Sequence, residues 1–261
     1  MNVEYHNVIN QLPLVNNWCV AVKLHKYYIK TDFELIDNIN IAKLYDRYGF
    51  SEWWRIEEII KYNDLNLVKL FILNDSSTLN WALMNSSEHG YMNIIKFLID
   101  SGADDWESGM DAASYGGQLD IVQFFIKKGA RDWDSGMCSA IEGNQTELFH
   151  FFIKKGAQDW DCGVQTAIEH DQTHYITFFI DKGANNWDEY TYHSIVNCRI
   201  DLTYFFIEKG ANDWNTMLYA ASCVNFIEMI VPLINLGANN LHECIDCTTS
   251  YEVINILRLY I

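Results

Sequence analysis

The sequence repeats itself every 27 residues, and this period constrains the fold more than any other feature. A Gly-Ala pair recurs with its glycine at positions 102, 129, 156, 183, 210 and 237, always at the same interval (129 − 102 = 27). Four residues after the glycine stands a tryptophan, at 106, 133, 160, 187 and 214, and Leu241 takes this place in the last copy. A fixed period of this size is typical of stacked structural repeats.

Each copy predicts a first helix that begins just after the tryptophan. In the copy that starts at Gly129, the carboxylate of Asp134 is expected to cap this helix by accepting from its free backbone amides. Apolar residues then mark its buried stripe at helical spacing: Met137, Ala140 and Ile141. The helix is expected to stop near Gly143.

A second helix follows in the same copy. Asn144, with Glu147 three residues later, is expected to cap its start. Its apolar face is read from Leu148, Phe149, Phe152 and Ile153. Lys154 and Lys155 suit the negative end of the helix, and Gly156 is expected to end it in a left-handed conformation.

A single copy cannot bury its own apolar face. Phe-Phe-Ile triplets occupy positions 124–126, 151–153 and 178–180. Burying one Phe or Ile stabilises a fold by about 1.5–3 kcal/mol. We therefore expect neighbouring copies to pack on one another, with stability roughly a sum over nearest neighbours.

The repeat weakens toward the N-terminus. Residues 94–99 match 121–126, and 67–72 match again one period earlier. The predicted organisation is an N-terminal helical cap (1–21), degenerate repeats (22–101), regular repeats (102–236) and a C-terminal capping repeat (237–261).

The regular copies resemble the ankyrin repeat. The residues that carry the likeness are Ala112-Ala113, Gly117, Leu119-Asp120-Ile121-Val122, Phe124-Phe125-Ile126 and Gly129-Ala130. They resemble the Ala-Ala, Gly-His, Val-Val, Leu-Leu-Leu and Gly-Ala-Asp run of that family, from about Val22 to the C-terminus. The resemblance implies a helical solenoid that binds proteins through its concave groove. Short Gly-Ala-x-x-Trp copies are similar to ankyrin proteins encoded by large DNA viruses of amoebae, which implies an adaptor role on host proteins.

The copies are about six residues shorter than the ankyrin unit of 33. The missing residues lie between Gly-Ala and the first helix, where the family builds a β-hairpin finger. We therefore predict an all-α, ankyrin-like helical repeat solenoid whose shortened loops lack long β-hairpin fingers.

The composition narrows the classes of partner. The chain has 18 Lys and Arg against 35 Asp and Glu, a formal net charge of −17. Such a surface repels phosphate backbones, so we expect no nucleic acid partner and favour a basic protein.

No apolar run is long enough to cross a bilayer, and the N-terminus does not resemble a secretory signal. The 7 cysteines are scattered and odd in number, which indicates reduced thiols and a cytoplasmic or nuclear location.

The tryptophan column (the five tryptophans named above) has two interpretations. The indoles could form an exposed strip that binds a partner, or they could pack each loop against the next and fill the space left by the missing fingers. Identity in every copy favours the packing role, because repeats share packing needs while binding residues vary.

Two rows of residues are candidates for partner binding. The acidic column, next to the tryptophans, comprises Glu107, Asp134, Asp161, Asp188 and Asn215, followed by His242. Helix capping would explain these residues, and an acidic edge that steers a basic partner is the functional alternative. The variable row, four residues further on, comprises Asp111, Cys138, Gln165, Tyr192 and Tyr219, followed by Asp246. This row would face the groove of an ankyrin-like solenoid, and ordinary drift on a solvated surface is the alternative.

No residue pattern indicates an enzyme. Cys244 and Cys247 lie near His242 but lack the second pair that a closed zinc site needs. No nucleophile–base arrangement or phosphate-binding loop stands out. We expect no catalytic residues, no metal and no cofactor.

The predicted function is a monomeric scaffold or adaptor that binds a protein partner. The alternative is a structural component, for example of a virion, that self-associates through its apolar C-terminal end.

Overall fold

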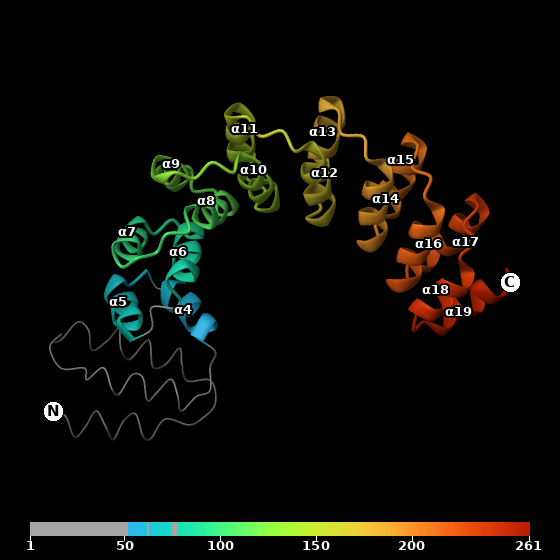
Figure 1. Ribbon diagram of the computed structural model, residues 1–261, viewed down its shortest axis with the longest axis horizontal. Coiled ribbons are helices and arrows are strands. Elements are labelled where there is room, and N and C mark those ends of the chain that lie inside the picture. The colour runs from blue at the N-terminus through green and yellow to red at the C-terminus, as the bar shows by residue number, and fades with distance from the viewer. Residues whose placement is uncertain (1–51, 62, 75–77) are drawn as a thin grey trace, which may run out of the picture. The chain divides into compact units, whose positions relative to one another are not determined.

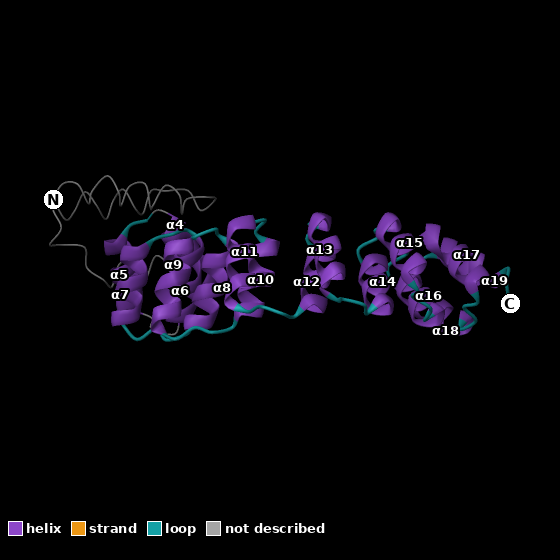
Figure 2. Cartoon of the chain, turned by 90° about the horizontal axis from the view of Figure 1, so that it is seen from above, coloured by secondary structure: helices purple, strands orange, loops and turns teal. Residues whose placement is uncertain are grey.

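The computed structural model describes residues 52–61, 63–74 and 78–261, and within these ranges every regular element is a helix (Figure 2). The expected N-terminal cap over residues 1–21 lies outside these ranges, as does the first part of the degenerate repeats. The chain divides into two compact units: one holds residues 1–82 and 96–103, and the other holds 83–95 and 104–261.

The described part of the first unit is built on one helix pair, α4 (Glu52–Lys61) and α5 (Leu65–Asn74). Both helices contribute buried aliphatic side chains to its core: Ile56, Ile59, Ile60, Val68 and Ile72. The next pair, α6 (Leu79–Glu88) and α7 (Met92–Asp100), contributes residues to both units.

The second unit is a succession of helix pairs (Figure 1). The first helices of the pairs are α8 (Trp106–Tyr115), α10 (Trp133–Glu142), α12 (Trp160–Glu169), α14 (Trp187–Val196), α16 (Trp214–Cys223) and α18 (Leu241–Cys247). The second helices are α9 (Leu119–Lys128), α11 (Thr146–Lys155), the short 3-10 helix η2 (Thr173–Tyr175) with α13 (Ile176–Lys182), α15 (Ile200–Lys209), α17 (Ile227–Leu236) and α19 (Tyr251–Arg258). Each first helix packs on the first helix of the next pair, so like helices form rows. The expected all-α helical-repeat fold is confirmed.

In each copy from the one that begins at Gly102 to the one that begins at Gly210, two left-handed residues let the chain reverse direction. One is the glycine that ends the second helix, such as Gly156 at φ 111°. The other lies in the turn between the two helices and is Asn144 at φ 55° in that copy. Asn144 was predicted to cap α11, and that prediction is wrong, because Gln145 is the N-cap residue. Asparagine suits the turn since its short polar side chain tolerates the left-handed region.

The loops between copies are as short as predicted. Only residues 129–132 join α9 to α10, and the same four positions join every later pair. The alanine of each Gly-Ala pair is buried, as Ala130 and Ala157 show. No strand, and hence no β-hairpin finger, occurs in the described part of the chain.

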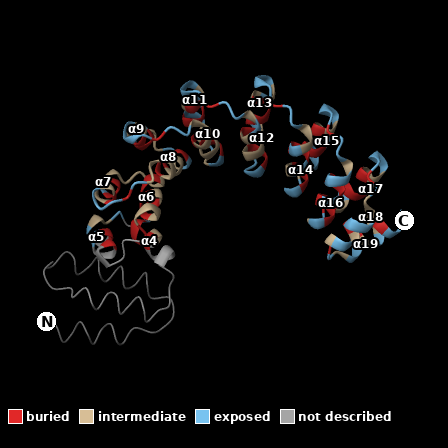
Figure 3. Ribbon diagram, in the orientation of Figure 1, coloured by how far each residue is buried: buried red, intermediate tan, exposed pale blue. Residues whose placement is uncertain are grey.

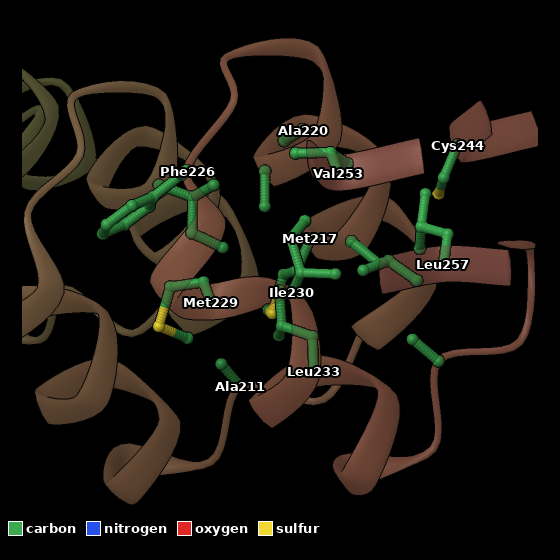
Figure 4. Packing of buried hydrophobic residues seen from close by; sticks show 14 residues of the cluster. Ala211, Met217, Ala220, Phe226, Met229, Ile230, Leu233, Cys244, Val253 and Leu257 are labelled. Carbon is green, nitrogen blue, oxygen red and sulfur yellow. The ribbon is translucent and has the colours of Figure 1, made fainter. Parts of the chain in front are cut away.

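The core runs between the two rows of helices (Figure 3). The middle residue of each Phe-Phe-Ile triplet is fully buried, and Phe149 packs edge-on against Phe178 of the next copy at 5.3 Å between centroids. At the C-terminal end the same kind of core joins α16, α17 and α19 through Met217, Ile230 and Leu257 (Figure 4). The expected packing of neighbouring copies on one another is therefore confirmed.

Candidate functional site

The tryptophan column packs against the protein's own helices. Trp106 stacks on Phe125 of α9 with 6.4 Å between ring centroids, and Trp187 stacks on Phe206 of α15 at 6.5 Å. The indoles are half-buried. These contacts support a packing role for the column, and the packing they show is against the second helix of the same copy.

The acidic column does not cap the first helices. In α8, α10, α12 and α16 the N-cap residue is an aspartate just before the tryptophan, and its carboxylate accepts from a first-turn amide: Asp105, Asp132, Asp159 and Asp213. Asn186 and Asn240 take this place in α14 and α18, without a side-chain cap bond. The prediction that Asp134 caps α10 is therefore wrong, because α10 begins at Trp133 and Asp134 lies inside its first turn.

Most members of the acidic column instead hold the loop of the following copy. Asp134 Oδ1 accepts the backbone N–H groups of Gln158 and Asp159 at 2.6 and 2.8 Å. Asp188 Oδ1 likewise accepts the N–H groups of Asn212 and Asp213 at 2.6 and 2.9 Å. The two carboxylate oxygens of Glu107 accept the N–H groups of Arg131 and Asp132 at 2.8 and 3.1 Å. Asn215 accepts one loop N–H at 2.8 Å. Folding alone thus explains why an acceptor recurs at this position.

Asp161 makes a different contact because the next copy differs in sequence. Tyr190 occupies the position that holds a glycine in the three preceding copies. Its ring packs on Phe206 at 5.4 Å between centroids, and its hydroxyl donates to Asp161. Burial raises the pKa of Tyr190, and the hydrogen bond to the Asp161 carboxylate raises it further. Asp161 therefore also joins two copies.

The variable row is divided between internal contacts and exposed positions. Ser135 Oγ donates to Asp111 Oδ2 at 2.6 Å, while Asp111 Oδ1 is buried without a hydrogen-bond partner. Burial raises the pKa of Asp111 from its usual 3.8 to about 6. Cys138 Sγ lies 2.9 Å from Cys162 Sγ. Asp111 and Cys138 thus connect adjacent first helices.

The later members of the row face solvent. Tyr192 and Tyr219 are 36% and 43% exposed, and half-buried Gln165 donates to Glu169 at 3.0 Å. One helical turn after each member of the row lies a residue that the repeat pattern did not single out: Tyr115, Glu142, Glu169, Val196 and Cys223. The helical i, i+4 spacing was the signal that could have found these residues.

We define the first-helix face as the variable row together with these neighbours. It comprises Asp111, Tyr115, Cys138, Glu142, Gln165, Glu169, Tyr192, Val196, Tyr219 and Cys223. None of these residues is buried. The face is therefore a surface shared by consecutive first helices of the second unit.

His193 organises two carboxylates beside this face. Its Nδ1 lies 3.1 Å from Glu169 Oε1, and its Nε2 lies 3.2 Å from Glu189 Oε1. A neutral imidazole can donate to only one of the two carboxylates, whereas an imidazolium donates to both. Glu169 is held by His193 and Gln165 together, which limits the positions its charge can take.

Among the helices from α8 onward, lysine and arginine are confined to one of the two rows. The first helices from α8 to α18 contain no lysine or arginine. The lysines lie in the last turns of the second helices, where Lys155, Lys182 and Lys209 stand 5.3–5.5 Å over phenylalanine rings. The first-helix face is consequently acidic and aromatic.

The described residues contain no group of three or more side chains placed to bind a metal ion. Among the helices of these ranges, none combines the length and apolar character needed to span a bilayer.

No protein-family model matches the chain, and no curated protein sequence matches it. Among solved structures, the chain is similar to the crystal structure of the human ASB11 ankyrin repeat domain, at 18% sequence identity and a TM-score of 0.46. That similarity covers 68% of this chain and 96% of the ASB11 domain.

Proposed function

We propose that the chain is a protein-binding scaffold whose first-helix face binds a partner segment that carries both basic and apolar side chains. The observation that carries this proposal is the exposed pair Tyr192 and Tyr219, which lies beside carboxylates on a surface whose helices lack lysine and arginine.

The aromatic part of the face would provide the affinity. Tyrosine is enriched at the centres of protein interfaces because it buries a large area and keeps a polar hydroxyl. Tyr192, Val196 and Tyr219 come from the adjacent helices α14 and α16, and all are exposed. An aliphatic or aromatic side chain of a partner would cover them.

The acidic part of the face would orient the partner and increase the rate at which it associates. Glu142 and Glu169 of this face are exposed on α10 and α12, and beside the face Glu189 is exposed on α14. Carboxylates at the rim of an interface steer a basic partner and disfavour an acidic one. The net charge of −17 acts in the same direction.

The acidic column contributes differently. The side chains from Glu107 to Asn215 already accept hydrogen bonds from the loops or from Tyr190, so this column stabilises the fold and does not bind the partner. Gln165, Tyr192 and Tyr219 are the residues of the sequence-based set that the proposal keeps at the contact surface. Whether the partner belongs to a host cell remains a prediction of the family resemblance.

A peptide selection tests the proposal. A random peptide library displayed on phage is selected against the immobilised chain, and the binding of an enriched peptide is measured by isothermal titration calorimetry. We expect the enriched sequences to combine Lys or Arg with aliphatic or aromatic residues. Tyr219→Ala should weaken binding about tenfold, because truncating an interfacial hot spot costs more than about 1 kcal/mol.

The control is Tyr204→Ala. Tyr204 is 43% exposed, as is Tyr219, but it lies on the second helix α15. This variant should bind the peptide as the unaltered chain does. Equal weakening by both variants, or enrichment of acidic peptides, would contradict the proposal.

A second candidate function is self-association. Tyr251, Leu259 and Ile261 are 84%, 82% and 62% exposed, which is unusual for large apolar side chains. A second copy of the chain could cover them. Sedimentation velocity over a range of concentrations decides: a monomer throughout excludes this candidate, whereas a dimer that Leu259→Asp dissociates supports it.

A further inference from the structure

We propose that Cys138 and Cys162 form a redox-responsive dithiol, which a small-molecule disulfide oxidises to a covalent bond between neighbouring copies of the repeat. The inference does not depend on the proposed binding function.

The two thiols are brought together by the packing of α10 on α12. Cys138 lies in the middle of α10, and Cys162 lies in the first turn of α12, 24 residues later. Their Sγ atoms are 2.9 Å apart, and both side chains are half-buried. A disulfide requires about 2.05 Å, so the sulfurs must approach by about 0.9 Å. Small side-chain rotations supply a movement of that size.

The surroundings give the two thiols different roles. The hydrogen bond between them raises the pKa of Cys138 and lowers the pKa of Cys162. Cys162 also lies at the positive end of a helix, which favours a thiolate. Asp159 and Asp134 oppose this effect. Cys162 is therefore the nucleophile, and Cys138 is the thiol that closes the bond.

The reaction with glutathione disulfide balances in two steps. The Cys162 thiolate attacks one sulfur of the oxidant, so that a mixed disulfide forms on Cys162 and one glutathione leaves as its thiolate. Cys138 then gives its proton to solvent and attacks Cys162 Sγ, which releases the second glutathione thiolate. Two protein thiols are oxidised, and one glutathione disulfide is reduced to two glutathione molecules.

The other described cysteines are placed less favourably. Cys247 Sγ lies 3.7 Å from the carbonyl oxygen of Tyr219 and 3.4 Å from that of Cys244. Cys247 also contacts Cys223, but burial and this hydrogen bond raise the pKa of Cys247 to about 12, so this second cysteine pair holds little thiolate. Cys198 is exposed in a turn. These thiols provide internal comparisons for the experiment.

Mass spectrometry of the full chain tests the proposal. The reduced protein is equilibrated in glutathione buffers of increasing oxidised fraction, the remaining thiols are alkylated, and the chain is cleaved with trypsin. Cleavage after Arg131, Lys154, Lys155 and Lys182 places Cys138 and Cys162 in separate peptides, each with a single cysteine. We expect these two peptides to be joined by a disulfide, while the chain stays monomeric on a non-reducing gel.

Two variants test the order of the steps. Cys138→Ser should leave Cys162 as a mixed disulfide with glutathione, because the closing thiol is missing. Cys162→Ser should leave Cys138 reduced. Cys198→Ser is the control and should still form the joined peptides. If a variant fails to fold, the joined peptides of the unaltered chain still decide the matter.

Thermal unfolding provides a second measurement of the disulfide between Cys138 and Cys162. The disulfide restricts the unfolded chain, so oxidation should raise the midpoint of thermal unfolding by about 5 °C, and dithiothreitol should reverse the rise. The proposal is overturned if Cys223 and Cys247 are oxidised while Cys138 and Cys162 stay reduced, or if the joined peptides come from two different chains.

Discussion

Replacing Asp134 with alanine isolates the contact that holds one copy of the repeat to the next. Asp134 Oδ1 accepts two backbone N–H groups of the following loop, those of Gln158 and Asp159. The variant leaves the helix α10 and the loop sequence intact, and it removes both bonds at once.

The magnitude follows from the geometry. A hydrogen bond to a charged group contributes about 1.5–3 kcal/mol net when it is shielded from water. Gln158 and Asp159 are exposed, so water replaces part of what the carboxylate supplied. We expect Asp134→Ala to lower the free energy of unfolding by about 2 kcal/mol. This value lies between the lower limit for one such bond, about 1.5 kcal/mol, and that for two, about 3 kcal/mol.

Two variants serve as controls. Asp134→Asn keeps one acceptor oxygen and mimics Asn215, which accepts a loop N–H at 2.8 Å, so its loss should be about half as large. Glu147→Ala removes an exposed carboxylate from the first turn of α11, the same place in a helix, and should cost less than about 0.5 kcal/mol.

The assay is urea unfolding followed by circular dichroism, combined with amide hydrogen exchange of the loop. In Asp134→Ala, the amides of Gln158 and Asp159 should exchange about 30-fold faster, which corresponds to about 2 kcal/mol. Unchanged exchange at these two amides, or an equal loss of stability in Glu147→Ala, would refute the argument.

Three further predictions concern single positions. Because burial raises the pKa of Asp111 to about 6, ionising it destabilises the fold, and stability falls as the pH rises from about 4 to about 6. Asp111→Asn should abolish this dependence and stabilise the protein at pH 7.5 by at most about 3 kcal/mol, with no gain at pH 4, as thermal unfolding at the two pH values will show. Cys198 has φ 52° at a turn position where other copies hold Gly, Asn or Asp, so Cys198→Asn should stabilise by up to about 1 kcal/mol in urea unfolding. A Cβ on Gly136 would stand 2.5 Å from Phe152 Cζ, so Gly136→Ala should cost about 1–3 kcal/mol in the same assay, whereas Ser139→Ala should cost much less.

The candidate surface was only partly predictable. The variable row was found by comparing copies, and Tyr192 and Tyr219 of that row are exposed. Asp111 and Cys138 belong to the same row but contact the next copy. Sequence comparison treats these members alike, because the difference depends on which residue of the neighbouring helix lies opposite each one.

The acidic column shows a second limit. Asp132 and Asp134 flank Trp133, and either could cap a helix that starts there. The structure assigns the cap to Asp132 and gives Asp134 two partners that lie 24 and 25 residues further along the chain. Local capping rules contain no information about such partners.

The sequence by itself determined the period, the paired helices, the glycine ends of the second helices and the buried stripe of the first helices. These features follow from local rules, since glycine conformation and helical spacing act within a few residues. Only the tertiary structure decided that the acidic column holds loops, that Cys138 meets Cys162, and which side chains of the variable row remain exposed. Those outcomes depend on how far one helix pair is displaced against the next, and packing between copies sets that displacement.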